Sequence, residues 1–212
     1  MHSEDLLRFR TLCLESKAEY KSKGSRFLAF AYPVVDEETV KYWQHILIRQ
    51  HPKAVHVCYA YRLGVGQKEL YHINDDGEPS GTAGRPILGQ IDSYHLTNTV
   101  LFVVRYFGGV LLGVPGLIKA YKTVSKAALA QALIEEKEIY EKFVLYCDYA
   151  FLPKIRWWLK KTQSTIIMQE LSQSCCLKVA VPLIHRSSLF ALESSGSCLL
   201  YTSPSPRDQR GS

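Results

Sequence analysis

The chain has 212 residues, of which 47% are hydrophobic and 22% are charged, and its formal net charge is +6. This composition is that of a soluble globular protein with room for one large or two modest domains. The six cysteines form no CxxC pair, which argues against a zinc site and a disulfide framework. No apolar run reaches the roughly 18 residues of a membrane span, and the N-terminus does not resemble a secretory signal. We therefore expect a cytoplasmic protein with no membrane contact.

The positive charge is spread along the chain. Residues 1–137 contain 17 basic and 14 acidic residues, residues 138–196 contain 7 and 5, and residues 197–212 contain 2 and 1. Because no part is strongly basic, any nucleic-acid site must be a local patch.

The first 106 residues show an alternation of strand and helix patterns. We expect strands over residues 11–23, 26–34, 54–63 and 69–73, with a helix between Asp36 and Pro52. Asp36 has the side chain of an N-cap. A helix over residues 86–96 precedes a strand over residues 99–106, whose continuous apolar run is typical of a strand buried on both faces.

The next helix is expected from near Pro115 to about residue 136. Its apolar stripe consists of Leu117, Tyr121, Val124, Ala128 and Ala132. Its opposite face carries Lys119, Lys122 and Lys126. A lysine stripe is usually a solvated face, but this one begins one turn beyond a glycine-rich segment and close to Arg105. A helix N-terminus with nearby Arg and Lys side chains can bind phosphate, so both interpretations remain open.

Residues 138–196 have the pattern of a ferredoxin-like domain that ends too soon. Strands are expected over residues 140–149, 164–171 and 175–184, with helices over residues 151–162 and 187–193. This is the order βαββ followed by the start of a second helix, without the last strand. Residues 197–212, SCLLYTSPSPRDQRGS, resemble translated sequencing-adapter sequence. We therefore predict domains over 1–137 and 138–196, the second incomplete, and a non-native tail over 197–212.

The loop after the fourth strand has the densest chemistry in the chain. Residues 72–88 read HINDDGEPSGTAGRPIL and contain three carboxylates, two hydroxyls and three glycines. The segment fits neither a Walker A loop nor a dinucleotide-binding fingerprint. The carboxylates can cap their own loop or pair with Arg85 and Arg105. The alternative is that Asp75, Asp76 and Glu78 act with His56 and His72 as a metal or acid–base cluster, although no spaced ligand motif is present.

A second motif follows about twenty residues later. Residues 105–121 read RYFGGVLLGVPGLIKAY, and residues 56–62 read HVCYAYR. With the DDGEPSGTAG segment, these motifs resemble those of the IMPACT/YigZ family. This sequence departs from the family pattern at Leu111, where many relatives carry Lys, and at Pro115, where many carry Gly. A phosphate contact at position 111 is therefore not transferred to this chain.

The resemblance implies a two-domain α+β fold. The N-terminal mixed-sheet domain would be similar to domain four of elongation factor G and to a ribosomal small-subunit protein, and the C-terminal domain would be ferredoxin-like. Eukaryotic relatives are linked to regulation of translation initiation. The family motifs place the candidate binding site at His56, Asp76, Glu78, Ser80, Thr82, Arg85, Arg105, Tyr106, Gly108, Gly109, Lys119 and Tyr121. We expect Arg105 and Lys119 to contact phosphate and Asp76 and Glu78 to organise the loop.

The resulting prediction is an IMPACT/YigZ-like protein that binds RNA or the ribosome and has a role in regulating translation. No catalytic residue, metal or cofactor and no DNA sequence specificity is expected, and the protein partner is unidentified. Two alternatives remain: a small-molecule hydrolase that uses residues 75–82, and a protein-binding scaffold.

Overall fold

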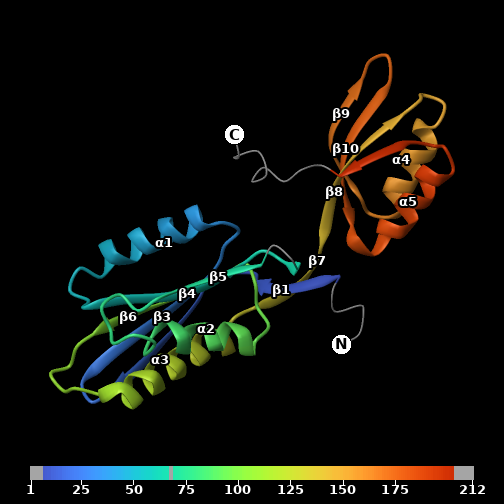
Figure 1. Cartoon of the computed structure of the whole chain (residues 1–212). Coiled ribbons are helices and arrows are strands. Elements are labelled where there is room, and N and C mark those ends of the chain that lie inside the picture. The colour runs from blue at the N-terminus through green and yellow to red at the C-terminus, as the bar shows by residue number, and fades with distance from the viewer. Residues whose placement is uncertain (1–6, 67–68, 203–212) are drawn as a thin grey trace. The chain divides into compact units, whose positions relative to one another are not determined.

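The computed structural model describes residues 7–66 and 69–202. They form two compact units (Figure 1): residues 9–137 make the first, and residues 138–202 with Leu7 and Arg8 make the second. The strands are β1 (Arg8–Leu12), β2 (Ser16–Ser22), β3 (Ser25–Pro33), β4 (His56–Leu63), β5 (Leu70–Asn74), β6 (Thr99–Tyr106), β7 (Ile134–Glu138), β8 (Tyr140–Cys147), β9 (Thr165–Leu171), β10 (Cys175–Pro182) and β11 (Leu199–Thr202). The helices are α1 (Glu37–Gln50), α2 (Gly84–Ser93), α3 (Gly113–Ala130), α4 (Leu152–Lys161) and α5 (Arg186–Ser194). None of these helices is long and apolar enough to cross a membrane.

The first unit is built on a five-stranded sheet in the order β2-β3-β6-β4-β5. Each neighbouring pair is antiparallel. Helix α1 covers one face, and α2 and α3 cover the other (Figure 1). The middle strand β6 is buried from Thr99 to Arg105, as its continuous apolar sequence predicts. The predicted α+β fold with two domains is confirmed.

Side-chain alternation along the strands builds a separate core on each face of this sheet. Cys58 and Ala60 of β4 pack towards α2 and α3, whereas Val57 and Tyr59 pack on the α1 side. The same period of two places Arg105 on the α2–α3 face, because it follows Leu101 and Val103 at alternate positions of β6. Side-chain alternation therefore divides the residues of β4 between the two cores.

Two predicted elements have different bounds in the structure. The single strand expected over residues 11–23 is two strands, because β1 pairs with β7 and β2 pairs with β3 in another sheet. Helix α3 ends at Ala130, not near residue 136, and the charged segment that follows belongs to β7. The charge of that segment hid the strand, because only one face of β7 has a partly buried apolar residue, Ile134.

The second unit has the strand order β11-β8-β10-β9, with all neighbours antiparallel, and the element order βαββαβ. This is the complete ferredoxin-like arrangement. The expectation that the last strand is missing is corrected here. Residues 199–202 form β11 beside β8, with Cys198 buried and Leu200 packed against the core. The sequence pattern does not predict this strand, because it is only four residues long and belongs to a segment that otherwise resembles adapter sequence. Residues 203–212 lie outside the described part of the chain.

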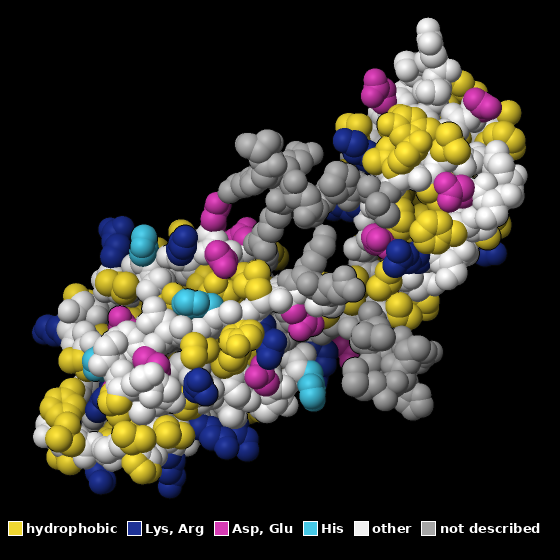
Figure 2. Space-filling view, in the orientation of Figure 1, with side chains coloured by type: hydrophobic (Ala, Val, Ile, Leu, Met, Phe, Trp, Pro, Cys, Tyr) yellow, Lys and Arg dark blue, Asp and Glu magenta, His cyan; other side chains and the backbone are white. Residues whose placement is uncertain are grey.

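The surface of the first unit has a marked apolar region. Figure 2 shows hydrophobic side chains gathered at the end of this unit where, in Figure 1, β6 leads into α3. The exposed large hydrophobic residues of that segment are Phe107, Val110, Leu111, Val114 and Ile118.

Candidate functional site

The loop between β5 and α2 is held in place at its helix end by Asp75. One carboxylate oxygen accepts hydrogen bonds from the N–H groups of Ala83 (3.0 Å) and Gly84 (2.8 Å), and the other accepts from Gly81 (2.8 Å). These N–H groups lie at the start of α2, where the residue at the N-cap position, Ala83, has no capping side chain. Burial opposes ionisation of Asp75, but the three hydrogen bonds and the charge of Arg85 outweigh it and lower its pKa.

Asp76 fastens the same loop to the sheet. Its Oδ2 accepts a 2.6 Å hydrogen bond from the N–H of Val57 in β4. Its carbonyl oxygen lies 2.7 Å from Nδ1 of His56. Because a carbonyl only accepts, Nδ1 of His56 carries the proton in this bond. Asp76 has a φ of +43°, a conformation that Asp tolerates better than most residues, and its N–H donates to Oδ1 of Asn74.

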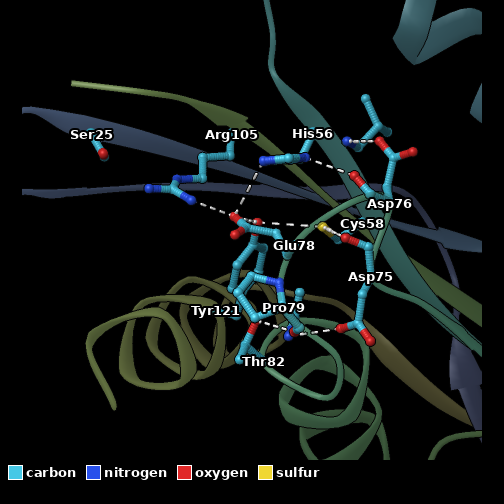
Figure 3. Close-up of polar contacts among 12 residues, drawn as sticks. Ser25, His56, Cys58, Asp75, Asp76, Glu78, Pro79, Thr82, Arg105 and Tyr121 are labelled. Carbon is cyan, nitrogen blue, oxygen red and sulfur yellow. Dashed lines mark hydrogen bonds and ion pairs between the residues drawn. The ribbon is translucent and has the colours of Figure 1, made fainter. Parts of the chain in front are cut away.

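Glu78 turns inward from the loop and is the centre of a buried cluster (Figure 3). Its Oε1 lies 2.5 Å from Nη1 of Arg105, 2.7 Å from the hydroxyl of Tyr121 and 4.0 Å from Nε2 of His56. Only 2% of its side chain is exposed. A buried carboxylate needs such partners, since an unpaired charge would be costly to remove from water. These contacts join the loop to β4, β6 and α3.

Tyr121 and Cys58 complete the buried cluster. Burial, together with Cys58 and the charge of Glu78, raises the pKa of Tyr121, so its phenol stays protonated and donates to Glu78. The thiol of Cys58 lies 3.3 Å from the Tyr121 hydroxyl and 3.0 Å from the carbonyl oxygen of Asp75. Burial also raises the pKa of this thiol, as is usual for a cysteine in an apolar core.

Arg105 lies between two aromatic rings. The centre of its guanidinium is 5.5 Å from the ring of Phe27 and 5.7 Å from that of Phe107, both within the range of a cation–π contact. Only 6% of the Arg105 side chain is exposed, and its Nε has no hydrogen-bond partner in the described part of the chain. In this arrangement Arg105 neutralises Glu78 and is covered from solvent by Phe107.

Steric and conformational constraints explain why two glycines, Gly108 and Gly109, follow β6. A Cβ on Gly108 would lie 1.9 Å from the carbonyl carbon of Gly24, so the two chain segments can approach only without a side chain there. The N–H of Gly108 also donates to Oγ of the buried Ser25 (3.2 Å). Gly109 has a φ of +84°, in the left-handed region. The FGG segment is thus shaped by its contact with the β2–β3 turn.

The remaining predicted site residues lie in different environments. Thr82 is buried and its hydroxyl donates to the carbonyl oxygen of Pro79 (2.6 Å), whereas Ser80 is exposed on the loop and Arg85 is exposed in the first turn of α2. Tyr106 lies on the opposite face of the sheet, with its hydroxyl 2.8 Å from Nδ1 of His51. Lys119 is exposed on α3. The structure therefore brings together His56, Glu78, Arg105 and Tyr121. Ser80, Arg85 and Lys119 lie apart from this cluster on the surface, and Tyr106 lies on the other face of the sheet.

The expectation that the loop carboxylates can cap their own loop is confirmed for Asp75, whose oxygens accept from Gly81, Ala83 and Gly84. Asp75 is nevertheless absent from the candidate site residues, because nothing in the sequence shows which of the three carboxylates caps the loop. No group of three or more His, Cys, Asp or Glu side chains in residues 7–66 and 69–202 is arranged as metal ligands would be.

The fold and the site place this chain among two-unit α+β proteins whose first unit is organised around a buried carboxylate, here Glu78, at the end of its sheet. The model of the Impact N-terminal domain matches residues 23–129. The chain is 34% identical to IMPACT family member YigZ of Escherichia coli over 161 residues, which are 76% of this chain and 79% of that protein. It is 46% identical over 108 residues, 51% of this chain and 56% of the relative, to the IMPACT family member in pol 5'region of Thermus thermophilus.

A solved structure titled "Crystal structure of an hypothetical protein" superposes with a TM-score of 0.73 at 30% identity, over 93% of this chain and 98% of that one. This likeness extends across both units of the chain. The chain belongs to the IMPACT family.

Proposed function

We propose that this protein binds single-stranded RNA through the exposed lysines of α3. The observation that carries the proposal is the charge of that helix. Lys119, Lys122 and Lys126 are all exposed, and the 18 residues of α3 include no Asp or Glu. No ion pair between described residues involves any of the three. They are therefore free to contact phosphates.

The spacing of these lysines supports a backbone contact. At 1.5 Å per residue, Lys119 and Lys122 are about 4.5 Å apart along the helix axis, and Lys122 and Lys126 about 6 Å apart. Long, mobile Lys side chains at these intervals can follow a single-stranded phosphate backbone. The buried face of α3, with Leu117, Tyr121 and Val124, fixes the orientation of the helix.

Arg105 has another role in this proposal. Its side chain is buried and paired with Glu78, so a phosphate could reach it only if the cluster opened. We therefore assign Arg105 to positioning the loop and α3, and assign the phosphate contacts to Lys119 and its two neighbours.

The hydrolase alternative gains no support from the loop. Asp75 and Asp76 accept hydrogen bonds from backbone N–H groups, and Glu78 is neutralised by Arg105. These carboxylates already have structural partners. The family resemblance supports a link to translation, and the proposed target is accordingly ribosomal or messenger RNA.

The test is a titration of fluorescent single-stranded RNA of mixed sequence with the full chain. The variant Lys119→Ala/Lys122→Ala/Lys126→Ala should bind this RNA more weakly. The negative slope of log affinity against log salt concentration should become less steep by about 2, since each of the three lost phosphate contacts contributes about 0.7. Salt would be varied between about 50 and about 200 mM.

The control removes three exposed positive charges on the α1 side of the sheet, with the variant Lys41→Ala/Arg49→Ala/Lys53→Ala. Both variants have the same net charge, so a difference between them reports the location of the charge. Equal affinity and equal salt dependence of the two variants would show that the α3 lysines are only a solvated face.

A further inference from the structure

The exposed apolar segment between β6 and α3 has no role in the proposed RNA contact. Leu111 is 82% exposed, and Val114, Val110 and Phe107 are 51%, 50% and 48% exposed. With Ile118, they form the "107–118 patch": five large apolar side chains within twelve residues. Single exposed apolar residues are normal, but a contiguous group beside charged residues is typical of an interaction surface.

The patch continues into the lysines of α3. Val114, Ile118 and Lys122 are spaced four residues apart and share one stripe of the helix. Lys119 lies beside Ile118 on the exposed side. The surface is therefore apolar at the start of α3 and cationic one turn beyond Ile118. An occupant that covers both parts needs an apolar portion followed by negative charge.

The chemistry of the patch distinguishes between possible occupants. Four of its five side chains are aliphatic, and RNA bases stack on aromatic or guanidinium planes, so the patch suits bases poorly. A second copy of the chain would bring the lysines of two patches together, and like charges oppose such a contact. A protein segment with its own apolar stripe and acidic residues matches both parts of the surface.

We propose that the 107–118 patch and the adjoining Lys119 and Lys122 bind an acidic amphipathic helix of a partner protein. The apolar stripe of the partner helix packs against Leu111, Val114 and Ile118, and its Glu or Asp side chains pair with the two lysines. Because the same lysines are assigned to RNA, the partner helix and RNA exclude each other. That competition rests on the proposed RNA contact, whereas the docking does not.

The test is a selection from a display library of about 20-residue peptides with apolar residues at helical spacing and all other positions drawn equally from Glu, Lys, Ser and Ala. The full chain is the bait. The equal supply of Glu and Lys lets the selected pool report the charge preference of the surface. We expect a pool rich in Glu, and a selected peptide that binds in solution by fluorescence anisotropy.

Variants then locate the peptide on the surface. We expect the affinity for the peptide to fall about tenfold or more in Leu111→Ser/Val114→Ser and, separately, in Lys122→Glu. All three side chains are exposed, so folding should be unaffected, and circular dichroism verifies it. The control is Val35→Ser, which removes an apolar side chain that is 77% exposed outside the patch and should leave affinity unchanged.

Several results would overturn the proposal. One is a selected pool that is basic or neutral, or binding that is insensitive to Leu111→Ser/Val114→Ser. Another is that this double variant lowers the affinity for RNA as much as the triple lysine variant does, which would assign the patch to the RNA interface. A third is a concentration-dependent mass in sedimentation that Leu111→Ser/Val114→Ser abolishes, which would make a second copy the occupant. Peptide binding without RNA binding would retain the docking site and refute only the RNA function.

Discussion

Oε1 of Glu78 lies 2.5 Å from Nη1 of Arg105, and both side chains are almost completely buried. Among the other Arg–Glu pairs of the described residues, the pair of Arg26 and Glu19 has side chains that are 49% and 37% exposed. The two pairs have the same chemistry in opposite environments. Their comparison separates the effect of burial from that of charge pairing.

We predict that Arg105→Met lowers the free energy of unfolding by about 3–5 kcal/mol, because it leaves the buried Glu78 without its counter-charge. Arg26→Met, at the exposed pair, should cost no more than about 1 kcal/mol. The double variant Glu78→Gln/Arg105→Met should recover part of the loss, since it removes both charges. Urea unfolding measures all three, and equal costs for the two single variants would contradict the structural role of the buried pair.

Asp75 should make stability depend on pH in acid. Its folded-state pKa lies below the ordinary value of 3.8, so its ionised form stabilises the fold at pH values above that value. This contribution is lost as the pH falls below 3.8 and through the lower folded-state pKa. We predict that Asp75→Asn costs about 1–2 kcal/mol at neutral pH and progressively less in acid. Urea unfolding of both proteins at neutral pH and at about pH 3 tests this, and a constant difference would show that ionisation of Asp75 is irrelevant.

Two glycines should respond to alanine with opposite signs. In Gly108→Ala the new Cβ would lie 1.9 Å from the carbonyl carbon of Gly24, so the backbone must move, at a cost of about 1–3 kcal/mol or more. Gly89 lies inside α2, and a Cβ added there would meet no neighbouring atom within 4 Å, so Gly89→Ala should raise the free energy of unfolding by about 0.5–1 kcal/mol. Thermal unfolding of the two variants gives the comparison. A stabilising Gly108→Ala would refute the close contact.

The last strand of the second unit can be tested with two adjacent leucines. Leu200 packs against the core of that unit, whereas the neighbouring Leu199 is 60% exposed. We predict that Leu200→Ser destabilises the unit by about 1–2 kcal/mol and that Leu199→Ser changes little. Hydrogen exchange of the β8 amides, which pair with β11, provides the readout. Indistinguishable variants would mean that residues 199–202 do not form the strand in solution.

Much of the fold follows from local sequence patterns, and the buried cluster does not. The period of two in β4, the continuous apolar run of β6 and the apolar stripe of α3 identify two strands, a helix and their buried faces, because each pattern depends on near neighbours in sequence. The pairing of Glu78 with Arg105 and Tyr121 spans 27 and 43 residues. Local periodicity carries no information on such partners.

A signal for the cluster was nevertheless present. Tyr121 belongs to the apolar stripe of α3, and Arg105 shares its strand face with Leu101 and Val103, so the sequence pattern places both polar groups on buried faces. Buried polar groups require partners. The expectation that Arg105 contacts phosphate came from the family motif and from its position beside the glycine-rich segment, and neither indicates that its side chain is buried.

The sequence distance between Glu78 and its partners also has a consequence for synthesis. Tyr121 is translated 43 residues after Glu78, which takes about 2–9 seconds at typical rates. During that interval the carboxylate lacks the phenol that it contacts in the finished protein. The contacts of Asp75 and Asp76 with residues 56–84 can form earlier, so the buried cluster is completed after the loop has been attached to the sheet.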